Sequence, residues 1–513
     1  MPEADVEENL CLKPNLKPKI KSRFFVKRFF LFIVNIVLCV LLYSCLSEED
    51  YTLDASARLT FSTDTLSFDT VIAGEPTGTH TFQVFNHHSK GIRIRRIYLE
   101  KGKSSFFRLN IDGVSLKEGE TTDLEILGGD SLRIFAELTA PVTDSNLPSA
   151  LEETLFFQLE SGVLQKMMLK GSGQRVTIMR SVVLKKDTVL SSERPYQIFD
   201  SLVVDEGVTL TLSSGCRLWF HPTASLIVRG RLLAEGTLQA PIEMRGDRLG
   251  NMFSNQPYDR IPNQWGGVVF ASTSTENKLN YCDIHSGAFG IRCDSADATP
   301  LKLLLENSII HNVEAEAFSS KMCNTIVGNT QITNAGGDCV RLIGGKHSFT
   351  HCTIGRFYVF QGQGGVAVRF SNHDGGKRFP LWQADFSNCL ITGYSSDDIM
   401  GEPSARYKDE PFNYKFNHCL LNTPKTEDKN LIKCLFEEEL PDDQGKAKHF
   451  SPGFDLKKLL FSFLLSPHSS AVNKADPAVS RTLYPHDRLG NNRFLDGTPD
   501  IGCYEALPLS TEK

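Results

Sequence analysis

Alternating apolar and polar positions predict short β-strands in the first part of the chain. Thr79 to Phe85 alternates in this way, and Gly91 to Leu99, Ser131 to Leu138 and Thr154 to Leu159 continue the pattern between turn residues. A period of two places one face of a strand against a core and the other in solvent. Roughly seven short strands over about 115 residues favour a β-sandwich spanning residues 59–175.

From residue 176 the pattern becomes an imperfect repeat. In each repeat, a small residue is followed two positions later by Ile or Leu. An Asn usually stands just before the small residue. Successive small residues are 22 to 37 positions apart, and they are Cys282, Ser308, Thr330, Cys352, Cys389 and Cys419. Each interval fits one coil of about 22 residues with the excess looped out, which is typical of a parallel β-helix. Roughly a dozen coils fit into residues 176–505.

The repeat predicts which side chains stack inside this β-helix. Equivalent positions of successive coils lie above one another, roughly 4.8 Å apart. The small residues would form one inward ladder and the Ile or Leu residues a second, because two positions along a strand restore the same face. The Asn residues would occupy the bends, where their side chains bond the backbone and tolerate left-handed conformations.

Several segments of this repeat region resemble a known family. Val208 to Phe220 and Ala224 to Gly236 resemble the opening coils of bacterial right-handed parallel β-helix repeat lipoproteins, which have the pectate-lyase-like superfold. Ser466 to Asn473, Asp487 to Asn491 and Pro499 to Glu505 resemble the closing segment of that family. The resemblance implies a C-terminal cap within residues 176–505 that covers the unpaired strand edge of the last coil, with residues 506–513 as a tail.

The first region also carries a resemblance. Asp64 to Val71 and Lys170 to Gln174 resemble the immunoglobulin-like domains at the base of bacterial surface lipoproteins. Together, the two resemblances imply an all-β fold in which a right-handed parallel β-helix, a solenoid, follows an immunoglobulin-like β-sandwich.

The N-terminus has the layout of a secretion signal. A basic stretch from Lys13 to Arg28 precedes an apolar run from Phe29 to Leu42, which is shorter than the roughly 20 residues that span a bilayer. Leu42-Tyr43-Ser44-Cys45 resembles a lipobox, although Tyr43 is bulkier than the usual residue there. We therefore expect a signal peptide over residues 1–44 and acyl chains on Cys45. The alternative is an uncleaved anchor helix.

An acidic linker, residues 45–58, follows the expected cleavage site. Its Leu46-Ser47-Glu48-Glu49-Asp50 resembles the export signal that sends some Gram-negative lipoproteins to the cell surface, and the alternative is a solvated linker. The expected location is therefore the outer membrane, with a lipid anchor that joins the protein to the membrane at the cell surface.

Charge and cysteine usage narrow the possible partners. The 55 basic and 61 acidic residues nearly balance, and no long basic run lies beyond the N-terminus, so nucleic acid is excluded as an expected partner. The 13 cysteines include no Cys-x-x-Cys pair and no zinc-finger spacing, and their recurrence predicts buried, reduced thiols. His347 and His351 have metal-compatible spacing only on a helix, whereas a strand is expected there. We therefore predict neither a metal site nor a cofactor.

Two acidic residues are candidates for catalysis. Gly336 to Leu342 resembles the paired-aspartate motif of polygalacturonase-type hydrolases, but Gly337 replaces one aspartate, and Asp338 alone cannot both protonate a leaving group and activate water. Asp283 clusters with His285, Arg292 and Asp294 within about one coil. Asp397-Asp398 forms another acidic pair. Solvated loop residues are the alternative for all of these groups.

The expected function is therefore non-catalytic. We expect a surface-exposed lipoprotein with a binding or display role toward glycans, because the scaffold is well marked and no acid/base set is complete. A polysaccharide lyase or glycoside hydrolase acting on an acidic polysaccharide is the alternative. Six aromatic residues either stack on sugar rings or pack between coils, namely Tyr258, Trp265, Phe357, Tyr358, Trp382 and Tyr394.

Overall fold

The computed structural model describes residues 50–253, 256–360, 364–440, 446–451 and 461–506. The expected signal peptide, Cys45, the start of the acidic linker and the tail after residue 506 lie outside the described residues. Within these residues, no helix is both long enough and apolar enough to cross a membrane.

The first domain is a β-sandwich of two five-stranded sheets. One sheet has the order β1 (Thr60–Phe61), β3 (His80–Phe85), β8 (Ser131–Leu138), β5 (Phe107–Ile111) and β6 (Val114–Ser115). The other has the order β2 (Thr65–Ile72), β10 (Leu164–Gln174), β9 (Ser149–Leu159), β4 (Ile92–Leu99) and β7 (Glu120–Ile126). Strands β1 and β6 are only two residues long, too short for an alternating pattern to show, so the sequence underestimated the strand number. The immunoglobulin-like relationship stays a prediction.

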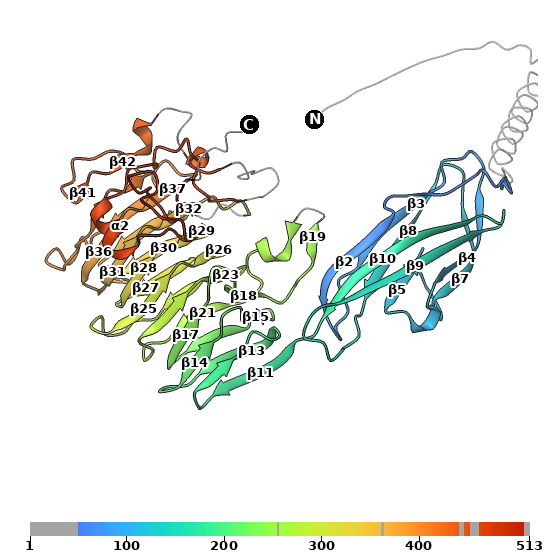
Figure 1. Ribbon diagram of the computed structural model, residues 1–513, viewed down its shortest axis with the longest axis horizontal. Coiled ribbons are helices and arrows are strands. Elements are labelled where there is room, and N and C mark those ends of the chain that lie inside the picture. Colours follow the sequence, from blue (N-terminus) through green and yellow to red (C-terminus); the bar gives the residue numbers. More distant parts are fainter. Residues whose placement is uncertain (1–49, 254–255, 361–363, 441–445, 452–460, 507–513) are drawn as a thin grey trace, which may run out of the picture.

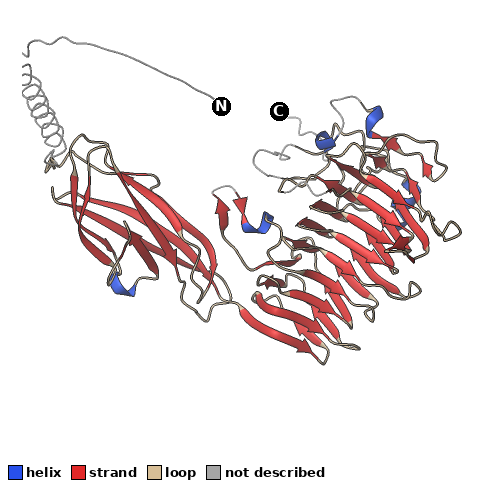
Figure 2. Cartoon of the chain, turned by 180° about the vertical axis from the view of Figure 1, so that it is seen from behind, coloured by secondary structure: helices blue, strands red, loops and turns tan. Residues whose placement is uncertain are grey.

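The second domain is a right-handed parallel β-helix with three faces, which Figures 1 and 2 show as stacked coils beside the sandwich. Face A consists of β12 (Thr188–Leu190), β14 (Thr209–Leu212), β17 (Arg231–Glu235), β22 (Asn277–Asn280), β25 (Leu301–Glu306), β28 (Asn324–Gly328), β31 (Gly345–Thr350), β36 (Leu381–Ser387), β39 (Lys415–Asn417) and β41 (Leu431–Ile432). Face B consists of β15 (Arg217–Phe220), β18 (Ile242–Gly246), β23 (Cys282–His285), β26 (Ile309–Val313), β29 (Gln331–Ala335), β32 (Thr353–Arg356), β37 (Leu390–Gly393), β40 (Leu420–Leu421) and β42 (Leu435–Phe436).

Face C consists of β16 (Ser225–Val228), β21 (Gly267–Phe270), β24 (Ile291–Cys293), β27 (Phe318–Lys321), β30 (Val340–Ile343), β33 (Val368–Ser371) and β38 (Ile399–Glu402). The long strands β11 (Thr177–Leu184) and β13 (Tyr196–Val204) begin the solenoid and run along both faces B and C. Two short hairpins project from the coils, β19 (Asn251–Phe253) with β20 (Gln256–Pro257) and β34 (His373–Asp374) with β35 (Lys377–Arg378).

The predicted inward ladders are confirmed. On face B, strand pairing places Asp283 beside Ile309 and Thr353 beside Leu390, which brings the small residues that precede them into register on neighbouring coils. All six small residues are fully buried, and so are the Ile and Leu residues two positions later. The ten cysteines among the described residues are all free. The ladder therefore selects side chains for their small volume, which Ser, Thr and Cys share.

The bends between faces A and B keep one backbone conformation in every coil. The residue just before each small residue has a positive φ of 48° to 55°, at Tyr281, Asn307, Asn329, His351, Asn388 and His418. The expected left-handed Asn is therefore confirmed in three coils. In two further coils an Asn was expected at the bend because it stands two positions before the small residue. These, Asn280 and Asn417, are instead the last residues of β22 and β39, and the bend residue is the next one, Tyr281 or His418. Each bend N–H donates to a carbonyl of the following coil, which fixes the bend whichever side chain occupies it.

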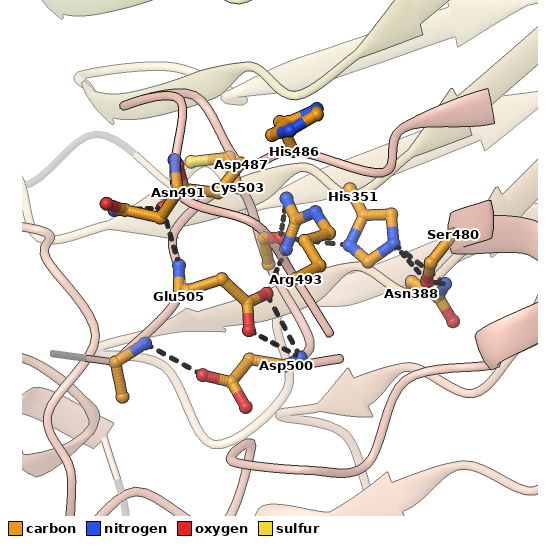
Figure 3. Close-up of polar contacts among 12 residues, drawn as sticks. His351, Asn388, Ser480, His486, Asp487, Asn491, Arg493, Asp500, Cys503 and Glu505 are labelled. Carbon is orange, nitrogen blue, oxygen red and sulfur yellow. Dashed lines mark hydrogen bonds and ion pairs between the residues drawn. The ribbon is translucent and has the colours of Figure 1, made fainter. Parts of the chain in front are cut away.

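The C-terminal segment, residues 461–506, lies along the side of the solenoid, where it contacts several coils. We expected it to cover the strand edge of the last coil. It contacts the bend residues of successive coils, as Figure 3 shows for His351 and Asn388, and that it covers the last strand edge stays a prediction. Its helix α2 (Pro477–Leu483) begins at Asp476, whose carboxylate accepts the N–H of Ala478. The hydroxyl of Tyr484 reaches as far back as Glu306, at 2.9 Å.

A second apolar core joins this segment to face B. Leu390 and Leu420 point outward from β37 and β40, and they pack against Ile501, Cys503 and neighbouring apolar residues. This explains why Leu390-Ile391 and Leu420-Leu421 break the alternation of a half-exposed strand. Both of their faces are covered.

The two domains contact each other through polar side chains. The Nε2 of Gln197 lies 3.1 Å from Oε1 of Glu75, and the amide of Asn251 donates to Asp69 at 3.2 Å. A cavity of about 500 Å³ lies between the domains, lined by residues that include His80 and His221.

Candidate functional site

Two histidines and an aspartate converge on the outer surface of face B. Asp283 and His285 are two positions apart on β23, so both point outward while Ile284 between them is fully buried. Strand pairing sets His285 directly beside His311 of β26 in the next coil. The side chains of Asp283, His285 and His311 are 33%, 6% and 23% exposed, so the cluster is recessed but open to solvent.

Both imidazoles approach one carboxylate oxygen. The Nδ1 of His285 lies 3.0 Å, and the Nε2 of His311 3.3 Å, from Oδ1 of Asp283. The two rings stack with centroids 4.7 Å apart and an interplanar angle of 25°. Burial alone would raise the pKa of the Asp283 carboxyl, but the charges and hydrogen bonds of His285 and His311 hold it well below its ordinary value.

The surrounding structure fixes His285 in place. The indole N–H of Trp265 donates to the backbone carbonyl of His285 at 2.8 Å. Trp265 is almost fully buried and stacks on Phe220, with ring centroids 4.2 Å apart. Trp265 is thus a packing residue, and the possibility that it stacks on a sugar is not supported.

A cavity of about 250 Å³, here called the face-B pocket, adjoins this cluster. Three parts of the chain line it: Arg260 of the 3-10 turn Tyr258–Arg260, the outward residues of β26 and β29, and the C-terminal segment. The lining residues from face B are Ile309, His311, Asn312, Gln331, Thr333 and Asn334. The C-terminal segment contributes Phe461 to Leu464 and Tyr504.

One polar atom of the pocket lining has no partner. Asn334 is only 2% exposed, and its side-chain oxygen Oδ1 accepts no hydrogen bond. By contrast, Gln331 is fully engaged, because it accepts from the Tyr504 hydroxyl at 2.8 Å and donates to Thr333 at 3.0 Å. A buried acceptor without a donor costs about 1–3 kcal/mol, so a ligand that donates to Asn334 would recover that free energy.

The predicted cluster around Asp283 is therefore correct only in part. Asp283 and His285 lie together, whereas Arg292 and Asp294 lie at face C and pair with each other at 3.1 Å. His311 was not among the predicted site residues. Aligning Ile309-Ile310-His311 with Asp283-Ile284-His285 as successive rungs of the repeat would have found it.

Asp338, the other candidate, is engaged in hydrogen bonds and an ion pair. It is 4% exposed, and its two oxygens accept from the Val366 N–H at 2.9 Å and from Arg369 at 2.7 Å. Arg369 also pairs with Glu402 at 2.6 Å. Both carboxylate oxygens of Asp338 thus have donors within the protein.

The remaining expected candidates do not form a site. Asp398 is buried, which raises its pKa to about 6, while neighbouring Asp397 accepts the N–H of Ile399. The Nε2 of His347 donates to the Gly344 carbonyl and its Nδ1 lies 2.7 Å from the Thr325 hydroxyl, whereas His351 contacts the C-terminal segment, so the two do not share a ligand. Phe357 is fully buried, whereas Trp382 and Tyr394 are 40% and 44% exposed.

Comparisons with known proteins give only distant likenesses. No model of a known family matches the chain, and no curated protein matches it. The catalytic unit of the GH87 α-1,3-glucanase of Streptomyces thermodiastaticus is similar over 74% of this chain and 80% of its own, with 10% identity and a TM-score of 0.24. A PapD-like domain of human CEP192 covers 24% of this chain and 90% of its own, with 12% identity and a TM-score of 0.17.

A family 123 glycoside hydrolase of Clostridium perfringens is similar over 22% of this chain, with 5% identity and a TM-score of 0.15. The match spans only 26% of that hydrolase. At such identities and TM-scores, the likenesses carry no argument about the chemistry of this chain.

Proposed function

We propose that the protein binds glycans in the face-B pocket. The observation that carries this proposal is the unpartnered Oδ1 of buried Asn334 at the pocket wall. A sugar hydroxyl is a donor that would satisfy it. The same wall carries further amide and hydroxyl groups on Asn312, Gln331 and Thr333, and the opposite wall carries aromatic rings. Few, fixed polar groups beside apolar surface are typical of small-molecule sites.

The size and charge of the pocket narrow the ligand. Its 250 Å³ is below the roughly 300–1,000 Å³ of pockets that enclose drug-sized molecules. It therefore suits one sugar unit at a time, as part of a longer chain lying along face B. Arg260 in the lining carries a permanent positive charge, and no carboxylate lies among the described lining residues. An acidic sugar is thus favoured over a neutral one.

Binding is better supported than hydrolysis. Glycoside hydrolysis by the usual route needs two carboxyl groups, one to protonate the leaving oxygen and one to act as base or nucleophile. Among the described residues that line the pocket, none is Asp or Glu. Asp283 at its edge would supply one. Polysaccharide lyase or hydrolase activity is the second candidate function, and the location of Asp283 near the pocket favours it.

The proposal includes display at the cell surface. A lipid anchor on Cys45 would join the protein to the outer membrane, and the sandwich would stand between the anchor and the solenoid. Only the sequence supports display at the cell surface. The supporting features are the signal layout before Cys45 and the acidic residues after it.

The test is a binding measurement with a matched pair of variants. Oligogalacturonides and cello-oligosaccharides, as acidic and neutral probes, are titrated against the full-length protein by calorimetry. Asn334→Gly removes the unpartnered amide while keeping a residue that tolerates the positive φ of 55°. Asn307→Gly makes the same change at φ 50°, in a residue outside the pocket lining.

We expect acidic probes to bind and Asn334→Gly to weaken their binding roughly 5- to 150-fold, the equivalent of 1–3 kcal/mol. Asn307→Gly should bind as the wild type does. No binding of any probe, or equal affinity in the two variants, would contradict the proposal. New reducing ends or unsaturated products in the mixtures would establish the catalytic alternative instead.

A further inference from the structure

We infer that Asp283, His285 and His311 form a binding site for a divalent transition-metal ion of the zinc class. One ligand atom of each residue lies within 4.8 Å of the others. No metal site was expected from the sequence, because His311 joins the other two residues only through the stacking of two coils. This inference does not depend on glycan binding.

The distances match those of ligands around one ion. Ligand atoms bound at about 2.0–2.1 Å in a tetrahedral arrangement lie about 3.3 Å apart. The nitrogens of His285 and His311 lie 3.0 Å and 3.3 Å from the Asp283 oxygen. Both rings project from adjacent parallel strands and stack on each other, so small side-chain rotations would bring the two nitrogens to the same separation.

The charge of Asp283 also favours a cation. Among the described residues, the ion-pair partners of Asp283 are the two imidazoles. The carboxylate lies in a recess, and no Lys or Arg is paired with it in the described part of the chain. A divalent ion bound by the carboxylate and the two ring nitrogens would compensate this charge.

The ligand types select the class of metal. Ca²⁺ and Mg²⁺ take oxygen ligands, whereas two imidazoles with one carboxylate suit Zn²⁺, Ni²⁺, Co²⁺ or Cu²⁺. Three protein ligands leave a position for water or an exogenous ligand, as in zinc sites that are not purely structural. His311 also lines the face-B pocket, so an ion at this cluster would lie at the pocket edge. If the proposed glycan binding is correct, the ion could coordinate a sugar carboxylate or hydroxyl.

The experiment titrates the full-length protein with metal alone. The protein is treated with a chelator, dialysed and titrated with Zn²⁺ by calorimetry, and Co²⁺ is added to a second sample as a spectroscopic probe. We expect one site, and a Co²⁺ spectrum with the visible bands of nitrogen and oxygen ligation. His311→Ala and Asp283→Asn should each weaken Zn²⁺ binding at least 100-fold. The exposed His468 gives the matched control His468→Ala, which should leave the affinity unchanged.

Each other outcome overturns the inference. It fails if the wild type binds no Zn²⁺, if His311→Ala binds as tightly as the wild type, or if the Co²⁺ spectrum shows thiolate charge-transfer bands from the cysteines. Circular dichroism checks that the variants are folded, and His311→Gln replaces any variant that is not. Because no glycan is present, loss of this site and loss of glycan binding are measured separately.

Discussion

Asn388 connects the bend of a coil to the C-terminal segment through three side-chain contacts, and a fourth joins it to His351. Its Oδ1 accepts the N–H of Asp476 at 2.7 Å, and its Nδ2 donates to the Asp476 carbonyl and the Ser480 hydroxyl, both at 3.2 Å. The Nδ2 also lies 3.0 Å from Nε2 of His351. The other ring nitrogen of His351 lies 3.1 Å from the Gly502 carbonyl, so Nδ1 carries the proton and Nε2 accepts (Figure 3).

Two substitutions separate the contributions of Asn388. Asn388→Gly keeps the positive φ of 55° but removes the bonds and leaves the Asp476 N–H without its acceptor. The unpaired Asp476 N–H costs about 1–3 kcal/mol, and loss of the other bonds costs about 1 kcal/mol. We therefore expect the free energy of local opening of the segment to fall by about 2–4 kcal/mol. Asn388→Ala should cost about 1–2 kcal/mol more, because a left-handed residue with a Cβ is strained.

Hydrogen exchange measured peptide by peptide is the appropriate assay, because a solenoid need not unfold in one step. At 1.4 kcal/mol per factor of ten, Asn388→Gly should speed exchange in residues 477–484 and 500–505 roughly 30- to 1,000-fold. Asn307→Gly is the control, since Asn307 bonds Asn280 and Asn329 but not the segment. Unchanged exchange in these peptides of Asn388→Gly would refute the view that Asn388 stabilises the segment.

Three further predictions concern thiols, acid and the anchor. Titration of the unfolded protein without reductant should recover most of the ten thiols after Cys45, and recovery near zero would reveal disulfides. Burial lowers the pKa of His347 to about 4, so the unfolded state binds its proton first as pH falls below about 6.5, and stability should drop by about 2 kcal/mol between pH 6.5 and 5. Buried His351, whose pKa is also lowered, adds to this pH dependence, so His347→Gln should make the drop in urea unfolding smaller by about this amount, and an unaltered drop would show that His347 does not contribute. Cys45→Ala should release the protein from membranes or leave it unprocessed, and an intact mass that retains residues 1–44 in the wild type would contradict cleavage.

The ladders could be predicted from the sequence because every coil requires the same types of inward side chain at the same positions. A small side chain, one intervening residue and then Ile or Leu satisfy the interior of every coil, so periodicity alone identified Cys282 and Ile284 as inward. The sandwich was predictable for the same reason. In both domains, burial of one strand face produces a periodic pattern of apolar residues in the sequence.

The face-B pocket and the proposed metal site produce no periodic pattern in the sequence. His311 is 26 positions from His285, and only the number of residues looped out between coils decides that they become neighbours. The pocket wall needs Arg260 and Tyr504, which are 244 positions apart in the numbering. Asp338 was singled out by a motif, yet its partner Arg369 comes from the next coil and makes it a buried ion pair.

The location of the C-terminal segment also affects biosynthesis. The described strands of faces A, B and C all end before residue 437, whereas Phe461 to Leu464 and Tyr504 belong to the last part of the chain to be synthesised. Coils can stack one after another as the chain emerges, because each contacts mainly its neighbours. A product truncated before residue 461 would therefore have its full set of coils but would expose Leu390 and Leu420 and lack one wall of the pocket. Ligand binding would then distinguish finished molecules from prematurely terminated ones, which a measurement of secondary structure could not do.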